Sequence, residues 1–179
     1  VAWGVAARAP ERVTTLSVFS IPHPGALDAQ IADPASCQYA ASSYFEFLVA
    51  PDNEPTILAD NAAILRSFYS GLEPEPVEAY IAQLGTVPAL RAALNWYRAN
   101  IAEGRRFLAE RLPGLVSVPT LFVWSSGDAA VCRESAETNA DFVTGPYRFE
   151  VIDGVGHYIP DEAPDQVTAL ILEQTLRAR

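Results

Sequence analysis

The sequence predicts an α/β fold: the last three strands of a parallel sheet with flanking helices, interrupted by an inserted all-helical region. Two observations predict this fold. Apolar, β-branched runs at 13–19, 120–124 and 147–152 read as strands, and helical periodicity flanks each of them. The stretch between the first and second runs has helical periodicity and no convincing strand. Because a sheet usually has about five or six strands, we expect the sheet to be incomplete within this chain.

Residues 1–25 are predicted to form a helix, a buried strand and a turn. Val1–Ala9 is rich in alanine, and Pro10 stands just behind its last turn. The run Val13–Phe19 (VTTLSVF) is β-branched and apolar, and a segment rich in proline and glycine closes it. We expect His23, which lies between two prolines of that segment, to fix the turn rather than to transfer protons.

Residues 26–114 are predicted to be a helical insertion. Proline, glycine and asparagine breakers separate its helices, and Asp33-Pro34 fits a helix start with proline at the first helical position. The expected helices are Tyr39–Val49, Thr56–Tyr69, Pro76–Leu84, Pro88–Asn100 and Ile101–Leu112.

Residues 115–179 are predicted to continue the first core segment. Thr120–Trp124 and Tyr147–Ile152 read as strands, and they alternate with two helices, Arg133–Phe142 and Pro164–Arg177. The chain therefore divides into a core segment at 1–25, the insertion at 26–114 and a second core segment at 115–179.

Composition and charge exclude several classes of protein. Half of the residues are hydrophobic, so intrinsic disorder is excluded as the main state. The 12 Lys and Arg against 22 Asp and Glu give a net charge of −10, which repels phosphate backbones and anionic lipids. No apolar run approaches the roughly 18 residues of a membrane span. We therefore expect a cytoplasmic protein with no nucleic-acid or membrane partner.

The two cysteines and the first residue each support a further prediction. Cys37 and Cys132 form no C-x-x-C pair and, with two histidines in the chain, supply no recognisable zinc site, so we interpret them as buried, reduced thiols. The chain has no methionine and opens at Val1 in helical sequence. We therefore expect its native start, and any signal peptide, to lie upstream.

Two loops that follow predicted strands carry an acid and a histidine. Residues 125–128 (SSGD) and 153–157 (DGVGH) come directly after the second and third strands. Catalytic groups gather beyond the carboxyl ends of parallel strands, so we expect Asp128 to accept the imidazole N–H of His157 and leave its other nitrogen to accept a proton.

Each of these residues alone has a simpler interpretation. His157 could be a loop histidine with satisfied hydrogen bonds, and Asp128 a turn carboxylate that caps local N–H groups. The pair, together with glycines at 154 and 156 that let the backbone turn sharply, favours catalysis.

These segments resemble parts of the α/β-hydrolase fold. Residues 7–13 (ARAPERV) and 20–24 (SIPHP) are similar to the helix and strand just after the nucleophile elbow, whereas 126–128 (SGD) and 154–157 (GVGH) are similar to the acid and histidine loops. The resemblance covers essentially the whole chain, and the helical insertion stands where the family places its cap. It implies the C-terminal portion of such a protein, beginning just after the elbow.

The insertion resembles the cap of epoxide hydrolases. Residues 94–98 (LNWYR) are similar to their N-W-Y-R segment, and residues 43–47 (SYFEF) to their earlier cap tyrosine segment. The resemblance implies that Tyr97 and Tyr44 donate hydrogen bonds to the epoxide oxygen, where ring opening builds negative charge. Alternatively both tyrosines line the seam between cap and core. That alternative is stronger for Tyr44, because Tyr39 lies close by.

The resemblance implies an epoxide hydrolase-like enzyme with a small, mostly apolar substrate. An upstream aspartate, absent from this chain, would form a covalent ester with the epoxide, and His157 would activate water to hydrolyse the ester to a diol. No metal or organic cofactor is implied.

Three alternatives stay open. A haloalkane or haloacid dehalogenase shares the acid and the base, although the N-W-Y-R tyrosine argues against it. A serine esterase has the same fold, but no G-x-S-x-G occurs here. The chain could also be a non-catalytic fragment that needs a missing N-terminal half, and by itself we expect it to be inactive.

Overall fold

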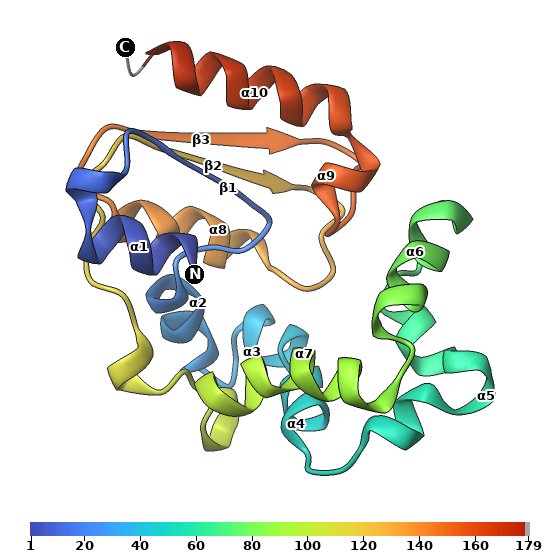
Figure 1. Cartoon of the computed structure of the whole chain (residues 1–179). Coiled ribbons are helices and arrows are strands. Elements are labelled where there is room, and N and C mark those ends of the chain that lie inside the picture. Colours follow the sequence, from blue (N-terminus) through green and yellow to red (C-terminus); the bar gives the residue numbers. More distant parts are fainter. Residues whose placement is uncertain (178–179) are drawn as a thin grey trace. The chain divides into compact units, whose positions relative to one another are not determined.

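The computed structural model (Figure 1) describes residues 1–177 and contains a three-stranded parallel sheet with the order β1-β2-β3. The strands are β1 (Leu16–Phe19), β2 (Thr120–Ser125) and β3 (Tyr147–Ile152). Thr120 pairs with Leu16 on one side and with Tyr147 on the other, which sets the register. The α/β fold class and its three parallel strands are confirmed. Residues 178 and 179, the end of the predicted second core segment, lie outside the described residues.

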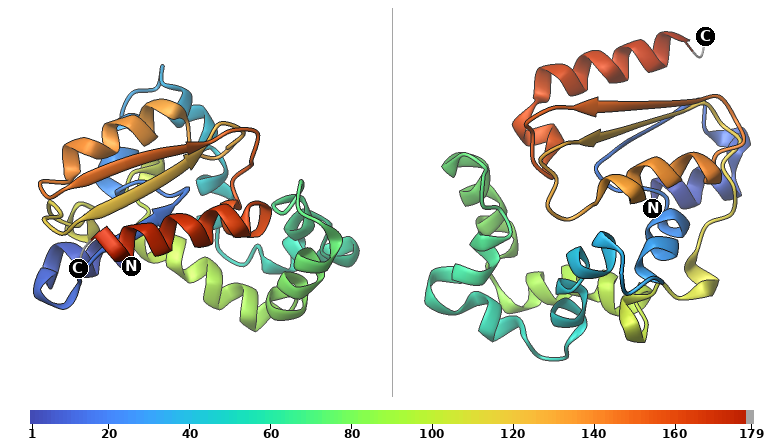
Figure 2. Two further views of the ribbon diagram at one scale, coloured as in Figure 1. Left: turned by 90° about the horizontal axis from the view of Figure 1, so that it is seen from above. Right: turned by 180° about the vertical axis from the view of Figure 1, so that it is seen from behind.

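The chain forms two compact units. The first consists of residues 1–42 together with the chain from residue 106 onward, and it holds the sheet. Its α-helices are α1 (Ala2–Arg8), α2 (Pro24–Ile31), α3 (Cys37–Ala41), α8 (Arg133–Glu137), α9 (Ile159–Glu162) and α10 (Pro164–Arg177). In Figures 1 and 2, α10 lies over one face of the sheet, and α1 and α8 lie over the other.

Strand β2 divides the interior of the first unit into two apolar cores. All six of its residues are buried, as expected for a central strand covered on both faces. Successive side chains point to opposite faces. Phe122 packs with Trp3 of α1 and Ala136 of α8, whereas Leu121 packs with Val167 of α10.

The second unit, Ser43–Arg105, is helical. It contains α4 (Tyr44–Val49), α5 (Glu54–Ser67), α6 (Pro74–Leu84) and α7 (Val87–Asn100). Leu48, Ile57, Leu65 and Leu94 form part of its buried core. This unit comprises fewer residues than the predicted insertion at 26–114. Helix α2, which lies largely within that predicted insertion, packs against α8 and so belongs to the first unit.

The predicted helix at 101–112 is wrong. Helix α7 ends at Asn100, and two short 3₁₀ turns, Glu103–Arg105 and Ala109–Arg111, follow it. Gly104 and Arg105 have positive φ angles of 69° and 65°, which an α-helix does not contain. The backbone N–H of Phe107 then donates to the Asp28 carboxylate at 2.8 Å instead of to a helical carbonyl.

Local hydrogen bonds also explain why Asp33-Pro34 does not begin a helix. The Asp33 carboxylate accepts the N–H of Ala35 at 2.9 Å and closes a turn. Helix α3 begins at Cys37 instead, where the Ser36 hydroxyl caps it by accepting the N–H of Tyr39.

Several element ends also differ from the prediction. The strand expected from Val13 begins at Leu16, because a 3₁₀ turn at Pro10–Arg12 precedes it. The helix expected at 133–142 is α-helical only to Glu137 and continues as a 3₁₀ helix, Thr138–Phe142. In contrast, β3 and α10 have the predicted bounds.

The two cysteines are not reduced thiols, and the interpretation made from the sequence is wrong. Cys37 and Cys132 form a disulfide, with their Cα atoms 6.2 Å apart. Cys37 begins α3 and Cys132 immediately precedes α8. Their separation of 95 residues hides this proximity, which arises only when α3 folds against the segment after β2.

Candidate active site

Asp128 and His157 meet beyond the carboxyl ends of β2 and β3. The imidazole Nδ1 of His157 lies 2.8 Å from Oδ2 and 3.0 Å from Oδ1 of Asp128. The Asp128 side chain is fully buried, whereas that of His157 is 25% exposed. Because an ionised carboxylate only accepts hydrogen bonds, Nδ1 carries the hydrogen of this pair. Nε2 of a neutral ring is then able to accept a proton from water.

The backbone after β2 holds the Asp128 carboxylate. Its Oδ1 accepts the N–H groups of Ala130 and Val131 at 2.8 and 2.9 Å. Asp128 therefore caps local N–H groups and pairs with His157 at the same time, so the two interpretations of this residue are compatible. Gly127 permits the close approach of the loops, since a Cβ there would lie 2.6 Å from the carbonyl oxygen of Val155.

Glu162 of α9, a helix that follows His157 in the chain, holds the histidine loop. Its carboxylate accepts the N–H of Gly156 at 2.8 Å and the N–H of Tyr158 at 3.1 Å, on either side of His157. Neither Glu162 nor the short helix that carries it is predicted from the sequence. A glutamate five residues after a glycine-flanked histidine is the signal that could have drawn attention to it.

Two serine hydroxyls bind the carbonyl groups of the same loop. Ser125, the last residue of β2, donates to the carbonyl of Gly156 at 2.6 Å, and Ser20 donates to the carbonyl of His157. Ser20 directly follows β1 and has a φ of 62°, an uncommon angle for a non-glycine residue. All three strand ends therefore contribute to the placement of His157.

His23 stands apart from this pair. It is fully buried, its ring stacks on Phe142, and its Nδ1 accepts the N–H of Gly25 at the start of α2. Burial lowers the pKa of His23, and the contact of Nε2 with the Gly114 carbonyl opposes this shift. The expectation that His23 fixes the turn is confirmed.

The two predicted tyrosines lie in the second unit, on packed helices. Tyr44 begins α4 and Tyr97 lies in α7, and both rings contact Phe45, with centroids 4.8 and 5.8 Å away. The ring of Trp96 lies against that of Tyr97, with centroids 5.0 Å apart, and we call Tyr44, Phe45, Trp96 and Tyr97 the Phe45 cluster. Burial raises the pKa of Tyr97, and the nearby Tyr69 adds to this shift. The Tyr97 phenol therefore remains a hydrogen-bond donor at neutral and moderately alkaline pH.

Neither a metal-binding cluster nor a membrane-spanning helix is present among residues 1–177. No group of three or more His, Cys, Asp or Glu side chains in that range is arranged to hold a metal ion. Within the same range, every helix is too short or too polar to cross a bilayer.

Comparison with known proteins identifies sequence relatives of this chain. No protein-family model matches the chain. It is 33% identical over 102 residues to Epoxide hydrolase A of Mycobacterium tuberculosis, covering 57% of this chain and 31% of that protein. It is 32% identical over 181 residues to the AB hydrolase superfamily protein YfhM of Bacillus subtilis, covering 97% of this chain and 61% of that protein.

A solved structure shares the fold. The crystal structure of an epoxide hydrolase from Bacillus megaterium in complex with an inhibitor matches with a TM-score of 0.79 and 22% identity, over 97% of this chain and 64% of that one. The chain thus spans less than two thirds of the length of each of these three proteins. The sequence relatives support an epoxide hydrolase-like α/β-hydrolase family for this chain, and the solved structure shares its fold.

Proposed function

We propose that this chain supplies the acid, the histidine and the cap of an enzyme that opens an epoxide to a diol. The single observation that carries the proposal is the Asp128–His157 pair at the ends of adjacent strands, with Nδ1 2.8 Å from a buried carboxylate oxygen. The likeness to proteins named epoxide hydrolases supports the substrate class. The substrate would be a small, mostly apolar epoxide.

The reaction we propose has two steps. In the first, an aspartate outside these residues attacks an epoxide carbon, the ring C–O bond breaks, and the released oxygen takes a proton from solvent to give a hydroxyalkyl ester. In the second, Nε2 of His157 takes a proton from water, and the resulting hydroxide attacks the ester carbonyl. The ester C–O bond then breaks, the departing diol oxygen takes the proton from the His157 imidazolium, and the carboxylic acid loses its proton to solvent to restore the aspartate carboxylate. Asp128 stabilises the imidazolium that forms in this step.

In the same proposal, Tyr97 and Tyr44 donate hydrogen bonds to the epoxide oxygen during ring opening. The raised pKa of Tyr97 supports this role, because the phenol stays protonated and can donate to the developing alkoxide. Tyr44 belongs to the same Phe45 cluster. We also propose that the helical stretch at 26–114 acts as the cap, and that 1–25 and 115–179 belong to the hydrolase core.

The test compares reaction classes in the full-length protein. Single-turnover experiments with an aryl epoxide, a haloalkane and a carboxylic ester would be run side by side. We expect diol from the epoxide and little product from the other two substrates. Halide release without epoxide opening would replace the proposal with a dehalogenase, and ester cleavage alone would replace it with an esterase. The chain of residues 1–179 by itself should show none of these activities.

A further inference from the structure

The amide of Gln38 is completely buried and completely hydrogen-bonded. Its Nε2 donates to the Ser42 hydroxyl and to the Ala130 carbonyl, both at 2.9 Å. Its Oε1 accepts the N–H of Cys132 at 2.9 Å and the Ser135 hydroxyl at 2.8 Å. Gln38 itself is only 1% exposed. The two backbone partners fix the amide orientation, since a carbonyl needs a donor and an N–H needs an acceptor.

These contacts lead directly to the acid. Gln38 binds the carbonyl of Ala130 and the N–H of Cys132, which flank Val131 in the chain. The N–H groups of Ala130 and Val131 in turn hold Oδ1 of Asp128. Gln38 therefore holds the segment that holds the carboxylate, and Asp128 lies 2.8 Å from the imidazole of His157.

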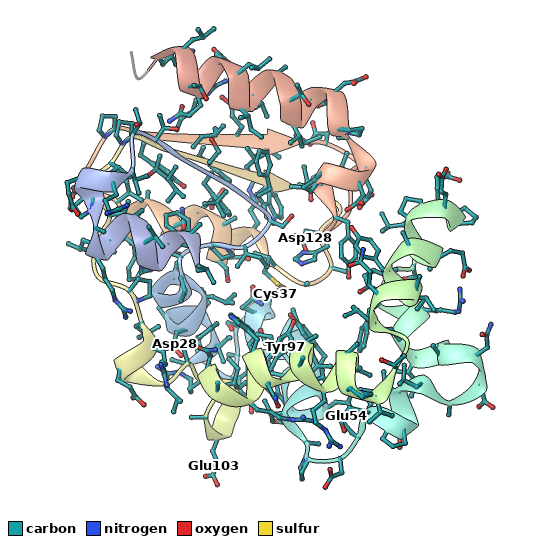
Figure 3. The ribbon with its side chains drawn as sticks, viewed as in Figure 1. Asp28, Cys37, Glu54, Tyr97, Glu103 and Asp128 are labelled. Atoms are coloured by element: carbon teal, nitrogen blue, oxygen red, sulfur yellow. A yellow bond between two sulfur atoms is a disulfide. The ribbon has the colours of Figure 1, made fainter. Side chains whose placement is uncertain are left out.

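The disulfide joins the same two segments. Cys37 directly precedes Gln38 in the chain, and Cys132 itself supplies the backbone N–H that Gln38 accepts. Figure 3 labels Cys37 and Asp128 and shows α3 beside the segment that follows β2. One covalent bond and a buried amide thus tie α3 to the acid loop, although α3 is distant from that loop in sequence.

We propose that Gln38 is a positioning residue for the Asp128–His157 pair, and that it acts through the backbone of residues 130–132. This inference rests on the proposed function for its kinetic readout. Without the amide, the carbonyl of Ala130 and the N–H of Cys132 lose their buried partners, and the segment shifts to satisfy them. The carboxylate then moves relative to the imidazole, and such misplacement slows the step that the imidazole serves.

The experiment uses full-length Gln38→Leu, which keeps the volume of the side chain and removes its hydrogen bonds, and Gln38→Glu, which puts an acceptor against the Ala130 carbonyl. Gln30→Leu is the matched control, because Gln30 lies in α2 of the same unit and donates to Thr138 rather than to the acid loop. Circular dichroism identifies any variant that does not fold. Gln38→Glu decides the question if Gln38→Leu does not fold.

The first readout is the downfield proton NMR signal of the imidazole Nδ1–H that is hydrogen-bonded to Asp128. We expect this signal to shift or broaden in both Gln38 variants and to be unchanged in Gln30→Leu. The second readout separates ester formation from ester hydrolysis in single turnovers with an epoxide. Hydrolysis should slow on the order of tenfold in the Gln38 variants, whereas ester formation should hardly change.

The proposal is overturned if the imidazole signal is unchanged in folded Gln38 variants, or if both kinetic steps slow equally, as a general loss of structure would cause. If the wild-type protein forms no ester from an epoxide, the proposed function fails instead. The imidazole signal then decides the role of Gln38 by itself.

Discussion

Two regions of the molecule hold their proposed functional side chains by different means. One region is the pair of loops at the ends of β2 and β3, and the other is the pair of helices α4 and α7. Asp128 and His157 are held by directional hydrogen bonds, from the N–H groups of Ala130 and Val131 on one side and through the Glu162 carboxylate on the other. Tyr44 and Tyr97 are instead packed against Phe45.

This difference matters for chemistry. A hydrogen-bonded loop fixes the direction of a lone pair, which proton transfer at His157 requires. Aromatic packing fixes the burial of a phenol and raises its pKa, which suits a hydrogen-bond donor. Substitutions in the first region should therefore change the chemical step through geometry, and substitutions in the second through the loss of a donor.

Asp128→Asn should have the largest effect. The amide can present its NH₂ group to Nδ1 and favour the wrong imidazole tautomer, while the loop keeps its shape. We expect ester hydrolysis in the full-length protein to slow on the order of 10⁴-fold, as for the equivalent change in other acid–histidine pairs. Stopped-flow measurement of the two steps checks this. A loss of less than tenfold would remove Asp128 from the mechanism.

Tyr97→Phe should slow ring opening on the order of 10²-fold, comparable with the deletion of one oxyanion donor. The ring and its packing against Phe45 remain, so the unfolding midpoint should hardly change. Tyr80→Phe is the matched control, because Tyr80 stacks on Tyr69 and lies outside the Phe45 cluster. Equal ring-opening rates in Tyr97→Phe and the wild type would show that Tyr97 is only a packing residue.

Glu162→Gln should have a smaller effect, about tenfold on ester hydrolysis. A neutral amide offers one acceptor oxygen, whereas the carboxylate accepts the N–H groups of both Gly156 and Tyr158. Glu134→Gln, in α8, is a control for loss of one negative charge in the same unit. If both variants lose activity equally, charge rather than the placement of His157 is responsible.

Glu54→Gln should leave both chemical steps almost unchanged and should destabilise the helical unit. Glu54 is fully buried, and Arg91 and then Arg98 lower its pKa from 4.5 to about 2 through hydrogen bonds. Because the folded pKa is depressed, this stabilisation is present above about pH 4.5 and is lost as the pH falls towards 2.

Hydrogen exchange of residues 43–105 at several pH values tests this prediction. Protection should be lower in Glu54→Gln than in the wild type at pH 7, and the difference should shrink as the pH falls below 4.5. A difference that does not depend on pH would show that packing, rather than charge, explains the destabilisation.

The sequence allows accurate prediction where local pattern and function coincide. Apolar runs and their periodicity predict the bounds of β3 and α10. The rule that catalytic groups gather beyond the ends of parallel strands predicts the pairing of Asp128 with His157. Gln38 and the Cys37–Cys132 bond escaped prediction, because each acts on a segment that becomes its neighbour only in the folded chain. Glu162 binds N–H groups close to it in sequence, and it escaped because the short helix α9 was not predicted.

The helical region shows a different limit. Its apolar periodicity predicts the bounds of α7 almost to the residue. The same periodicity wrongly predicts a helix at 101–112, where the N–H of Phe107 donates to Asp28, a residue of a segment distant in sequence. The roles proposed for Tyr44 and Tyr97 come from the resemblance to epoxide hydrolases. Periodicity alone identifies both as residues of amphipathic helices.

In the proposed mechanism, His157 activates the water that hydrolyses a covalent ester. The intact mass of full-length His157→Gln after incubation with an aryl epoxide tests this step. Glutamine cannot take the proton from water, so we expect the ester to accumulate and the mass to rise by one epoxide per chain, while the wild-type mass is unchanged at the end of turnover. Diol formation by His157→Gln at a near wild-type rate, with no added mass, would contradict this mechanism.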